Sequence, residues 1–309
     1  MKPFRQNVAI AIDGGGIKGV MVARALSILE EHLGQGAPEI FHLAAGTSTG
    51  SVLSAGIAAG LNGAEMYALY MGLGPMVFHR TIRSRLWPLF RYRYPQRPLK
   101  QALQAHLGDL TLGDLWGRSP RIDVVITAFD LLENRTRFIK PYKPDYADWS
   151  LVKAVLASSA VPTYFPIVEG RYIDGGVGSY ANPVYVAAYE LLFQLGWDPA
   201  ETTLLSLGTG RVPVAHDVSR ANRWWAWDWL PRILGAFMDS ATDQQVHLVD
   251  TFFQELDFRR FQVDLHQPIA MDDASALPVL SAYGEELARL ILNDITDRAM
   301  ELGAGRPMP

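Results

Sequence analysis

Residues 40–61, IFHLAAGTSTGSVLSAGIAAGL, predict a strand, a sharp turn and a helix in direct succession. The apolar run Ile40–Ala45 enters the turn, and a run rich in Gly, Ala and Ser, Ser48–Leu61, leaves it as a helix that can pack closely against a sheet. Between them, G46-TSTG matches the G-x-S-x-G pattern, which places a serine on a tight strand-to-helix turn with its hydroxyl exposed. The stretch therefore favours an α/β fold with Ser48 as the candidate nucleophile.

Two other glycine-rich stretches suggest partners for this serine. The loop D13-GGGIKG follows the apolar run Val8–Ile12 and precedes a helical pattern. Its backbone N–H groups are expected to converge at a helix N-terminus, where negative charge is favoured. Further along, Asp174 precedes two glycines, whose permissive backbone lets the chain turn sharply and bring a carboxylate into a crowded site. We expect an oxyanion-binding loop and a candidate base.

Residues 14–19 also satisfy G-x-G-x-x-G, the dinucleotide-binding pattern. That function needs an acid about 20 residues further on, at the end of the second strand. Glu39 lies near that distance but before the predicted second strand. A P-loop is excluded, because Val20 follows Gly19 where a Lys-Ser/Thr pair is required. An oxidoreductase that binds a dinucleotide at this loop is therefore a weaker alternative.

A serine nucleophile usually has a histidine as its base, oriented by a carboxylate. In the hydrolase order Ser, Asp, His, only the histidines after Asp174 qualify. These are His216, His247 and His266, and none lies in an evident catalytic loop. A Ser48 and Asp174 pair without histidine is the leading arrangement, and an α/β-hydrolase esterase with a Ser-His-Asp triad is the alternative.

The three motifs, in this order, resemble the patatin-like phospholipase family. Further stretches fit the same pattern, and the resemblance covers most of residues 8–255: A157-SSAVPTYFP, Asn182-Pro183 and L204-LSLGTG. The resemblance implies that Ser48 is the nucleophile and Asp174 the general base. It also implies an oxyanion hole made by the backbone amides of Gly14, Gly15 and Gly16.

Lys18 occupies a position where the family commonly carries arginine. Lysine keeps the positive charge but lacks the bidentate fork, so a looser contact with a phosphate or oxyanion is expected. The resemblance implies a three-layer fold with a mainly parallel central sheet flanked by helices. It implies a serine acyl hydrolase that cleaves fatty acyl esters of phospholipids or related glycerolipids, without metal or cofactor. A lipase that stays silent until a partner, oligomerisation or a small regulatory ligand opens it is a further alternative.

Composition limits the remaining possibilities. The chain has 309 residues and is 49% hydrophobic, enough for a sizeable core. We expect one domain over residues 1–309, with a motif-bearing core at about 8–212 and a helical C-terminal part at about 230–303. A net charge of −4 argues against a nucleic-acid binder, and no histidine and carboxylate spacing suggests a metal site.

The absence of cysteine fits a reducing cytosol. The apolar run before Asp13 has only five residues, too short for a signal-peptide core, and no stretch reaches the roughly 18 apolar residues of a membrane span. We expect a cytoplasmic protein whose membrane contact is peripheral.

Apolar runs and helical periodicity alternate along the chain, as in an α/β domain. The predicted strands are Val8–Ile12, Ile40–Ala45, Ile122–Phe129 and Thr203–Leu207. The predicted helices are Val20–Leu33, Ser48–Leu61, Leu151–Ser158, Val184–Leu195, Leu230–Leu256 and Ser281–Leu302. Phe129–Ile139 favours a hairpin, and Gly303–Pro309 a loose tail.

Two segments have compositions that suit contact with lipid. Residues 72–100 hold seven Arg or Lys and no acid, interleaved with aromatics, which fits anionic headgroups and equally an internal network. Residues 223–233, RWWAWDWLPRI, hold four tryptophans within six positions. For these tryptophans, packing beneath a cap is favoured over an acyl pocket or lid, because large aromatics dominate cores as readily as interfaces.

Overall fold

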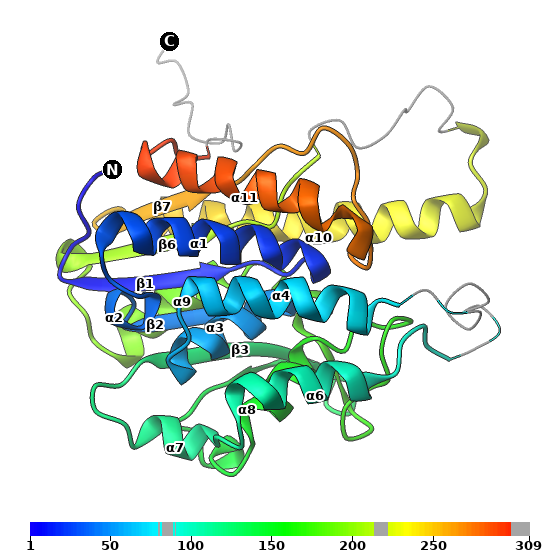
Figure 1. Cartoon of the computed structure of the whole chain (residues 1–309), viewed down its shortest axis with the longest axis horizontal. Helices are drawn as coiled ribbons and strands as arrows, with labels where there is room; N and C mark the ends of the chain where they lie inside the picture. Colours follow the sequence, from blue (N-terminus) through cyan, green and yellow to red (C-terminus); the bar gives the residue numbers. More distant parts are fainter. Residues whose placement is uncertain (80, 82–88, 90, 213–221, 298–309) are drawn as a thin grey trace.

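The computed structural model describes residues 1–79, 81, 89, 91–212 and 222–297, built around one mixed, mostly parallel sheet (Figure 1). The strand order is β4-β3-β2-β1-β6-β7, with β5 beside β3. The neighbours from β3 to β7 are parallel, whereas β4 and β5 run antiparallel to β3. The strands are β1 (Asn7–Ile12), β2 (Leu43–Gly46), β3 (Asp123–Asp130), β4 (Arg135–Ile139), β5 (Tyr172–Asp174), β6 (Thr202–Leu207) and β7 (Asp257–Phe261).

Helices cover both faces of the sheet, which confirms the predicted three-layer fold. The helices are α1 (Gly19–Leu33), α2 (Ala37–Ile40), α3 (Thr49–Ala59), α4 (Gly63–Val77), α6 (Gln96–Leu107), α7 (Leu112–Trp116), α8 (Leu151–Ser158), α9 (Val184–Tyr189), α10 (Ala226–Phe252) and α11 (Leu277–Leu292). Figure 1 shows α1, α4 and α11 side by side over one face, while α9 and α10 pack on the other. Side chains alternate along β1, so Ile10 and Ile12 enter the first core and Ala9 and Ala11 the second.

All four predicted strands are present, but the second starts later than expected. Ile40 ends the short helix α2 instead of opening the strand, so that prediction is wrong. The Glu39 carboxylate accepts the Gly36 N–H at 3.0 Å, which stabilises the first turn of α2, and the strand begins only at Leu43.

Three predicted helices have different bounds. α9 ends at Tyr189 and continues as a π-helical turn, Glu190–Gln194, where buried Glu190 forms an ion pair with Lys140. α10 begins and ends four residues before the predicted helix, and α11 begins at Leu277 and ends at Leu292. The predicted hairpin is confirmed by the antiparallel pairing of β3 and β4. Residues 298–309, which include the predicted tail, lie outside the described residues.

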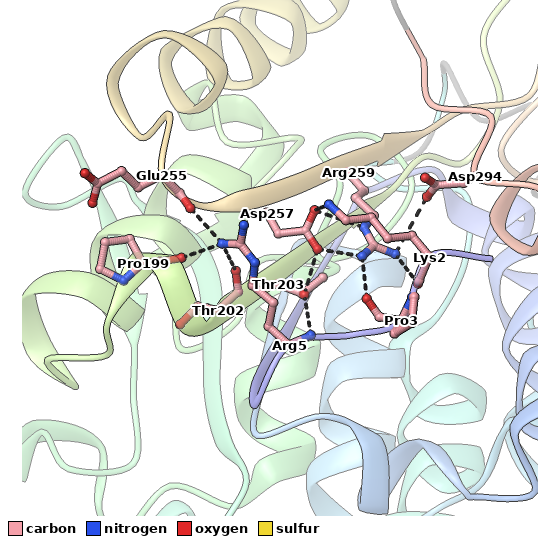
Figure 2. Close-up of polar contacts among 10 residues, drawn as sticks. All are labelled: Lys2, Pro3, Arg5, Pro199, Thr202, Thr203, Glu255, Asp257, Arg259 and Asp294. Atoms are coloured by element: carbon pink, nitrogen blue, oxygen red, sulfur yellow. Dashed lines mark hydrogen bonds and ion pairs between the residues drawn. The ribbon is translucent and has the colours of Figure 1, made fainter.

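A polar network fixes the amino ends of β6 and β7 to the start of the chain (Figure 2). Arg259 donates to the carboxylate of Asp257 at 2.5 Å and to the Pro3 carbonyl at 2.8 Å, and Lys2 donates to Asp257 at 2.7 Å. Arg5 donates to the Glu255 carbonyl at 2.7 Å. Burial alone would raise the pKa of Asp257, but the hydrogen bonds from Arg259 and Lys2 lower it to about 2. The network ties the amino edge of the sheet together, whereas the glycine-rich motifs follow the carboxyl ends of β1 and β2.

Candidate active site

Ser48 lies on the turn between β2 and α3, in the backbone conformation that the motif predicts. Its φ of 54° and ψ of −121° are unusual for a residue with a side chain and typically cost about 1–3 kcal/mol. The turn is held by its neighbours, because the Ser48 N–H donates to Ser158 Oγ at 2.8 Å and its carbonyl accepts from Ser51 Oγ at 2.6 Å. A Cβ at Gly50 would lie 2.1 Å from the Ile12 carbonyl oxygen. That position of the motif therefore has room only for glycine.

Asp174 ends β5 and is 5% exposed. Its Oδ1 accepts the Gly176 N–H at 2.8 Å, while Oδ2 accepts no hydrogen bond from the part of the chain that the structure describes. Burial raises the pKa of Asp174 to about 6, against the opposing effect of the Ser48 hydroxyl and the Gly176 amide. The Ser48 hydroxyl lies near the carboxylate without meeting hydrogen-bond geometry, as is common in unliganded sites. The two predicted residues are thus brought together, and one oxygen of the candidate base has no donor among the described residues.

A buried acid on β3, which sequence reasoning missed, fixes the position of β5. Asp130 accepts from Nε of Arg171 at 3.0 Å and from Nε of Arg137 at 3.1 Å, so it joins the segments on both sides of β3. The hydrogen bonds from Arg171 hold the pKa of Asp130 well below its usual range. Arg171 immediately precedes β5, which is only three residues long and ends at Asp174. No motif marks Asp130, because Arg171, the partner that ties it to β5, lies 41 residues away in the sequence.

The glycine-rich loop connects β1 to α1 through a short 3-10 turn, residues 16–18. The Gly14 N–H donates to the Ala181 carbonyl at 2.8 Å. The predicted role of this amide in an oxyanion hole would require this hydrogen bond to break, because an N–H donates to one acceptor at a time. The amides of Gly15 and Gly16 donate to no group among the described residues. At Gly16, φ is +62° and a Cβ would lie 2.3 Å from the Met271 carbonyl oxygen.

The base of this loop is clamped by an ion pair that the sequence did not reveal. Arg260 of β7 donates both ends of its guanidinium to Asp13, at 2.8 and 2.5 Å, and also donates to Ser206 at 2.8 Å. All three residues are buried. Lys18 lies nearby, and its burial lowers its pKa, while the charges of Asp239 and Asp13 oppose that effect. Two cations therefore lie at this loop: Arg260, which is paired with Asp13, and Lys18.

One cavity of about 1710 Å³ brings the predicted residues together. Its lining includes Gly14, Gly15, Gly16, Lys18, Ser48 and Asp174. A smaller apolar cavity of about 50 Å³ also borders Ser48 and Gly16. Its apolar lining includes Ile17, Val52, Leu73, Phe78, Leu99 and Phe165. Ser48 therefore separates a wide cavity with charged walls from a narrow apolar one.

The alternatives find less support in this geometry. His247 lines the wide cavity, but its ring nitrogen lies 3.3 Å from Thr251 Oγ1, and His266 packs against Tyr283. His216 lies outside the described residues. No histidine in the described part of the chain hydrogen-bonds to Ser48 or Asp174, and Glu39 caps α2 instead of ending β2, where a ribose would bind. Across those residues, no cluster of three His, Cys, Asp or Glu side chains is arranged to hold a metal ion.

The two segments whose compositions suit contact with lipid differ in their surroundings in the structure. In the basic segment 72–100, residues 80, 82–88 and 90 lie outside the described residues, but Arg93 belongs to an internal network and pairs with Asp272 at 3.2 Å. In the tryptophan-rich segment, Trp225 is 66% and Trp229 is 40% exposed. The prediction that these tryptophans pack beneath a cap is wrong for both. No helix of the described chain is long and apolar enough to cross a bilayer.

Comparisons with known proteins agree with the motifs. The model of the patatin-like phospholipase family matches residues 10–188. An intracellular phospholipase A2 of Caenorhabditis elegans is 32% identical over 66% of this chain and 19% of its own length. A cGAMP-activated phospholipase of Pseudomonas aeruginosa is 30% identical over 65% of this chain and 61% of its own. The chain thus spans less than two thirds of either relative. VipD from Legionella pneumophila shares the fold, with a TM-score of 0.51 and 13% identity over 94% of this chain and 67% of its own.

Proposed function

Because the chain belongs to the patatin-like phospholipase family, we propose that it is a serine acyl hydrolase that cleaves fatty acyl esters of phospholipids or related glycerolipids. One observation carries the dyad: Asp174 is buried, one of its oxygens has no donor in the described structure, and the Ser48 hydroxyl lies beside it. A carboxylate with a pKa of about 6 is ionised at neutral pH and is a better proton acceptor than an ordinary aspartate. Asp174 therefore acts as the general base without a histidine.

The reaction begins when Asp174 takes the Ser48 proton and Ser48 Oγ attacks the ester carbonyl. The negative charge moves to the carbonyl oxygen, where the amides of Gly15 and Gly16 are the proposed donors. When the intermediate collapses, the C–O bond to the alcohol breaks and Asp174 returns the proton to the leaving oxygen. Water activated by the same carboxylate then hydrolyses the acyl-enzyme and releases the fatty acid.

The two cavities suggest where the parts of the substrate lie. The narrow cavity beside Ser48 is almost wholly apolar and, at about 50 Å³, suits the first few carbons of the acyl chain, with Phe78, Leu99 and Phe165 setting its extent. The wide cavity takes the polar remainder, and Lys18 in its wall is the candidate contact for a phosphate. The positive charge of Lys18 supports this assignment, although its single ammonium gives less orientation than a guanidinium.

The proposal is tested by acyl release from a soluble p-nitrophenyl ester and from phospholipid vesicles. Ser48→Ala and Asp174→Asn should each lose hydrolysis of both substrates while circular dichroism shows an intact fold. His216→Ala, His247→Ala and His266→Ala are the matched controls, and each should remain active. Activity that survives Ser48→Ala would refute the nucleophile, and activity that disappears in one histidine variant would favour the triad.

The name of the Pseudomonas aeruginosa relative raises the alternative of an activator. The same panel is therefore measured with and without cGAMP. Hydrolysis that appears only with cGAMP, and only while Ser48 is present, would make this chain an activator-gated phospholipase. Equal hydrolysis in both conditions would show that the chain needs no such ligand.

A further inference from the structure

Four large apolar residues form an exposed row on the N-terminal half of α10. They are Trp225 immediately before the helix, and Trp229, Ile233 and Phe237 within it, each four residues after the last. Their exposed fractions are 66%, 40%, 58% and 52%. Four-residue spacing places side chains on one face of a helix, one above the other, over a length of about 18 Å. We call this row the apolar stripe.

The C-terminal end of the stripe lies beside the wide cavity. Figure 1 shows the N-terminal half of α10 extending past the ends of the strands, on the side where the chain turns from β1 into α1. One residue beyond the stripe, Met238 lines the cavity, and its methyl group lies 3.3 Å from where a Cβ on Gly176 would be. Val177, which is 40% exposed, lines the same cavity. The end of the stripe and the glycines after Asp174 therefore lie beside the same cavity.

The composition of the stripe suits a lipid surface. Exposed apolar surface of this extent marks a site of interaction, and tryptophan is favoured where an apolar surface meets water and headgroups. Arg232 stacks on Trp224 with its guanidinium carbon 4.4 Å from the ring centre, beside the first residues of the stripe.

We infer that the apolar stripe of α10 docks the protein on a phospholipid bilayer and directs a lipid from the membrane into the wide cavity. The inference rests on the proposed lipid hydrolase function. A second copy of the chain is the competing occupant, but it would cover the side of the cavity from which we propose that the lipid enters. A bilayer on the same surface brings the substrate to that side.

The test separates docking from chemistry. Trp225→Ser/Trp229→Ser and Ile233→Ser/Phe237→Ser are compared with the wild type in sedimentation with vesicles of phosphatidylcholine and phosphatidylglycerol. Loss of a partly inserted aromatic should weaken binding roughly tenfold. Hydrolysis of vesicle lipid should fall in parallel, while hydrolysis of a soluble ester stays unchanged, because no stripe residue lines the cavity. Phe252→Ser is the matched control, since Phe252 is 69% exposed at the other end of the same helix.

Two results would overturn the inference: vesicle binding of the stripe variants equal to that of the wild type, or an equal loss in Phe252→Ser. A wild-type dimer that the stripe variants convert to monomer, with vesicle binding unaffected, would assign the surface to a second copy. If instead the proposed hydrolase function is wrong, a different result is expected. In that case the wild type would bind vesicles through the stripe and hydrolyse neither substrate, so docking would stand without the chemistry.

Discussion

Replacing Asp174 with asparagine should stabilise the fold while it abolishes hydrolysis. Burial raises the pKa of this carboxyl from the ordinary 3.8 to about 6, so the folded protein holds an ionised group in a place that disfavours its charge. At 1.36 kcal/mol per pKa unit, keeping Asp174 ionised costs about 3 kcal/mol near pH 8. Asparagine removes this cost and can still accept the hydrogen bond from the Gly176 amide.

The stability that Asp174→Asn adds should depend on pH. Because the folded pKa is raised, the folded state binds more protons than the unfolded state between about pH 4 and pH 6. Wild-type stability therefore falls as the pH rises through this window, relative to the Asp174→Asn variant. The advantage of the variant should be near zero at about pH 4 and complete above about pH 7.

Thermal unfolding followed by circular dichroism at several pH values measures this difference. For a chain of this length, about 3 kcal/mol corresponds to a midpoint roughly 5 °C higher near pH 8. Asp145→Asn, at an exposed position, is the matched control and should leave the midpoint unchanged. The reasoning is refuted if Asp174→Asn lowers the midpoint near pH 8, or if its gain is as large at about pH 4 as at about pH 8.

Three other expectations follow from the same contacts. In the wild type, kcat/KM on a soluble ester should rise about tenfold per pH unit below about 6 and then level off, because only ionised Asp174 accepts the Ser48 proton; a half-point near 3.8 would contradict this. Asp257→Asn should lower the free energy of unfolding, measured with urea near pH 7, by about 2–3 kcal/mol, because Arg259 and Lys2 lose a charged acceptor. Since the folded pKa of Asp257 is lowered to about 2, that contribution is full above about pH 4 and lost toward pH 2, and an unchanged urea midpoint near pH 7 would refute the network's role. Phe165→Ala should enlarge the narrow cavity and so lengthen the acyl chain that the enzyme prefers among p-nitrophenyl esters, with each extra buried CH₂ worth about 0.8 kcal/mol. Val246→Ala, in the wide cavity, should leave the preferred length unchanged. An unchanged preference in Phe165→Ala would place the acyl chain elsewhere.

Much of the fold was predictable, because the signals that specify it are short in range. Apolar runs marked β1, β3 and β6, with glycines following closely after β1 and β6, and the G-x-S-x-G spacing marked the turn at Ser48. Elements without such signals were missed. β5 has only three residues, and three of the five residues of β7 are charged, with Arg259 and Arg260 both buried. Their places in the sheet depend on partners that a local pattern does not contain.

The candidate site was likewise predictable only in part. The sequence by itself identified Ser48, Asp174 and the glycine-rich loop, because a strained turn or a close backbone approach demands glycine at particular positions. The tertiary structure decided which amides remain free, since the N–H of Gly14 is taken by a carbonyl 167 residues away.

Tertiary structure also decided how the candidate site is held together and how the pKa of its proposed base is shifted. The ion pair between Asp13 and Arg260 joins residues 247 positions apart. The raised pKa of Asp174 comes from burial, which the residue type alone does not reveal. Local backbone preferences act over a few residues and can be read in order along the chain. Desolvation and long-range ion pairs arise only when distant segments pack together, so the chemistry of the base belongs to the folded chain.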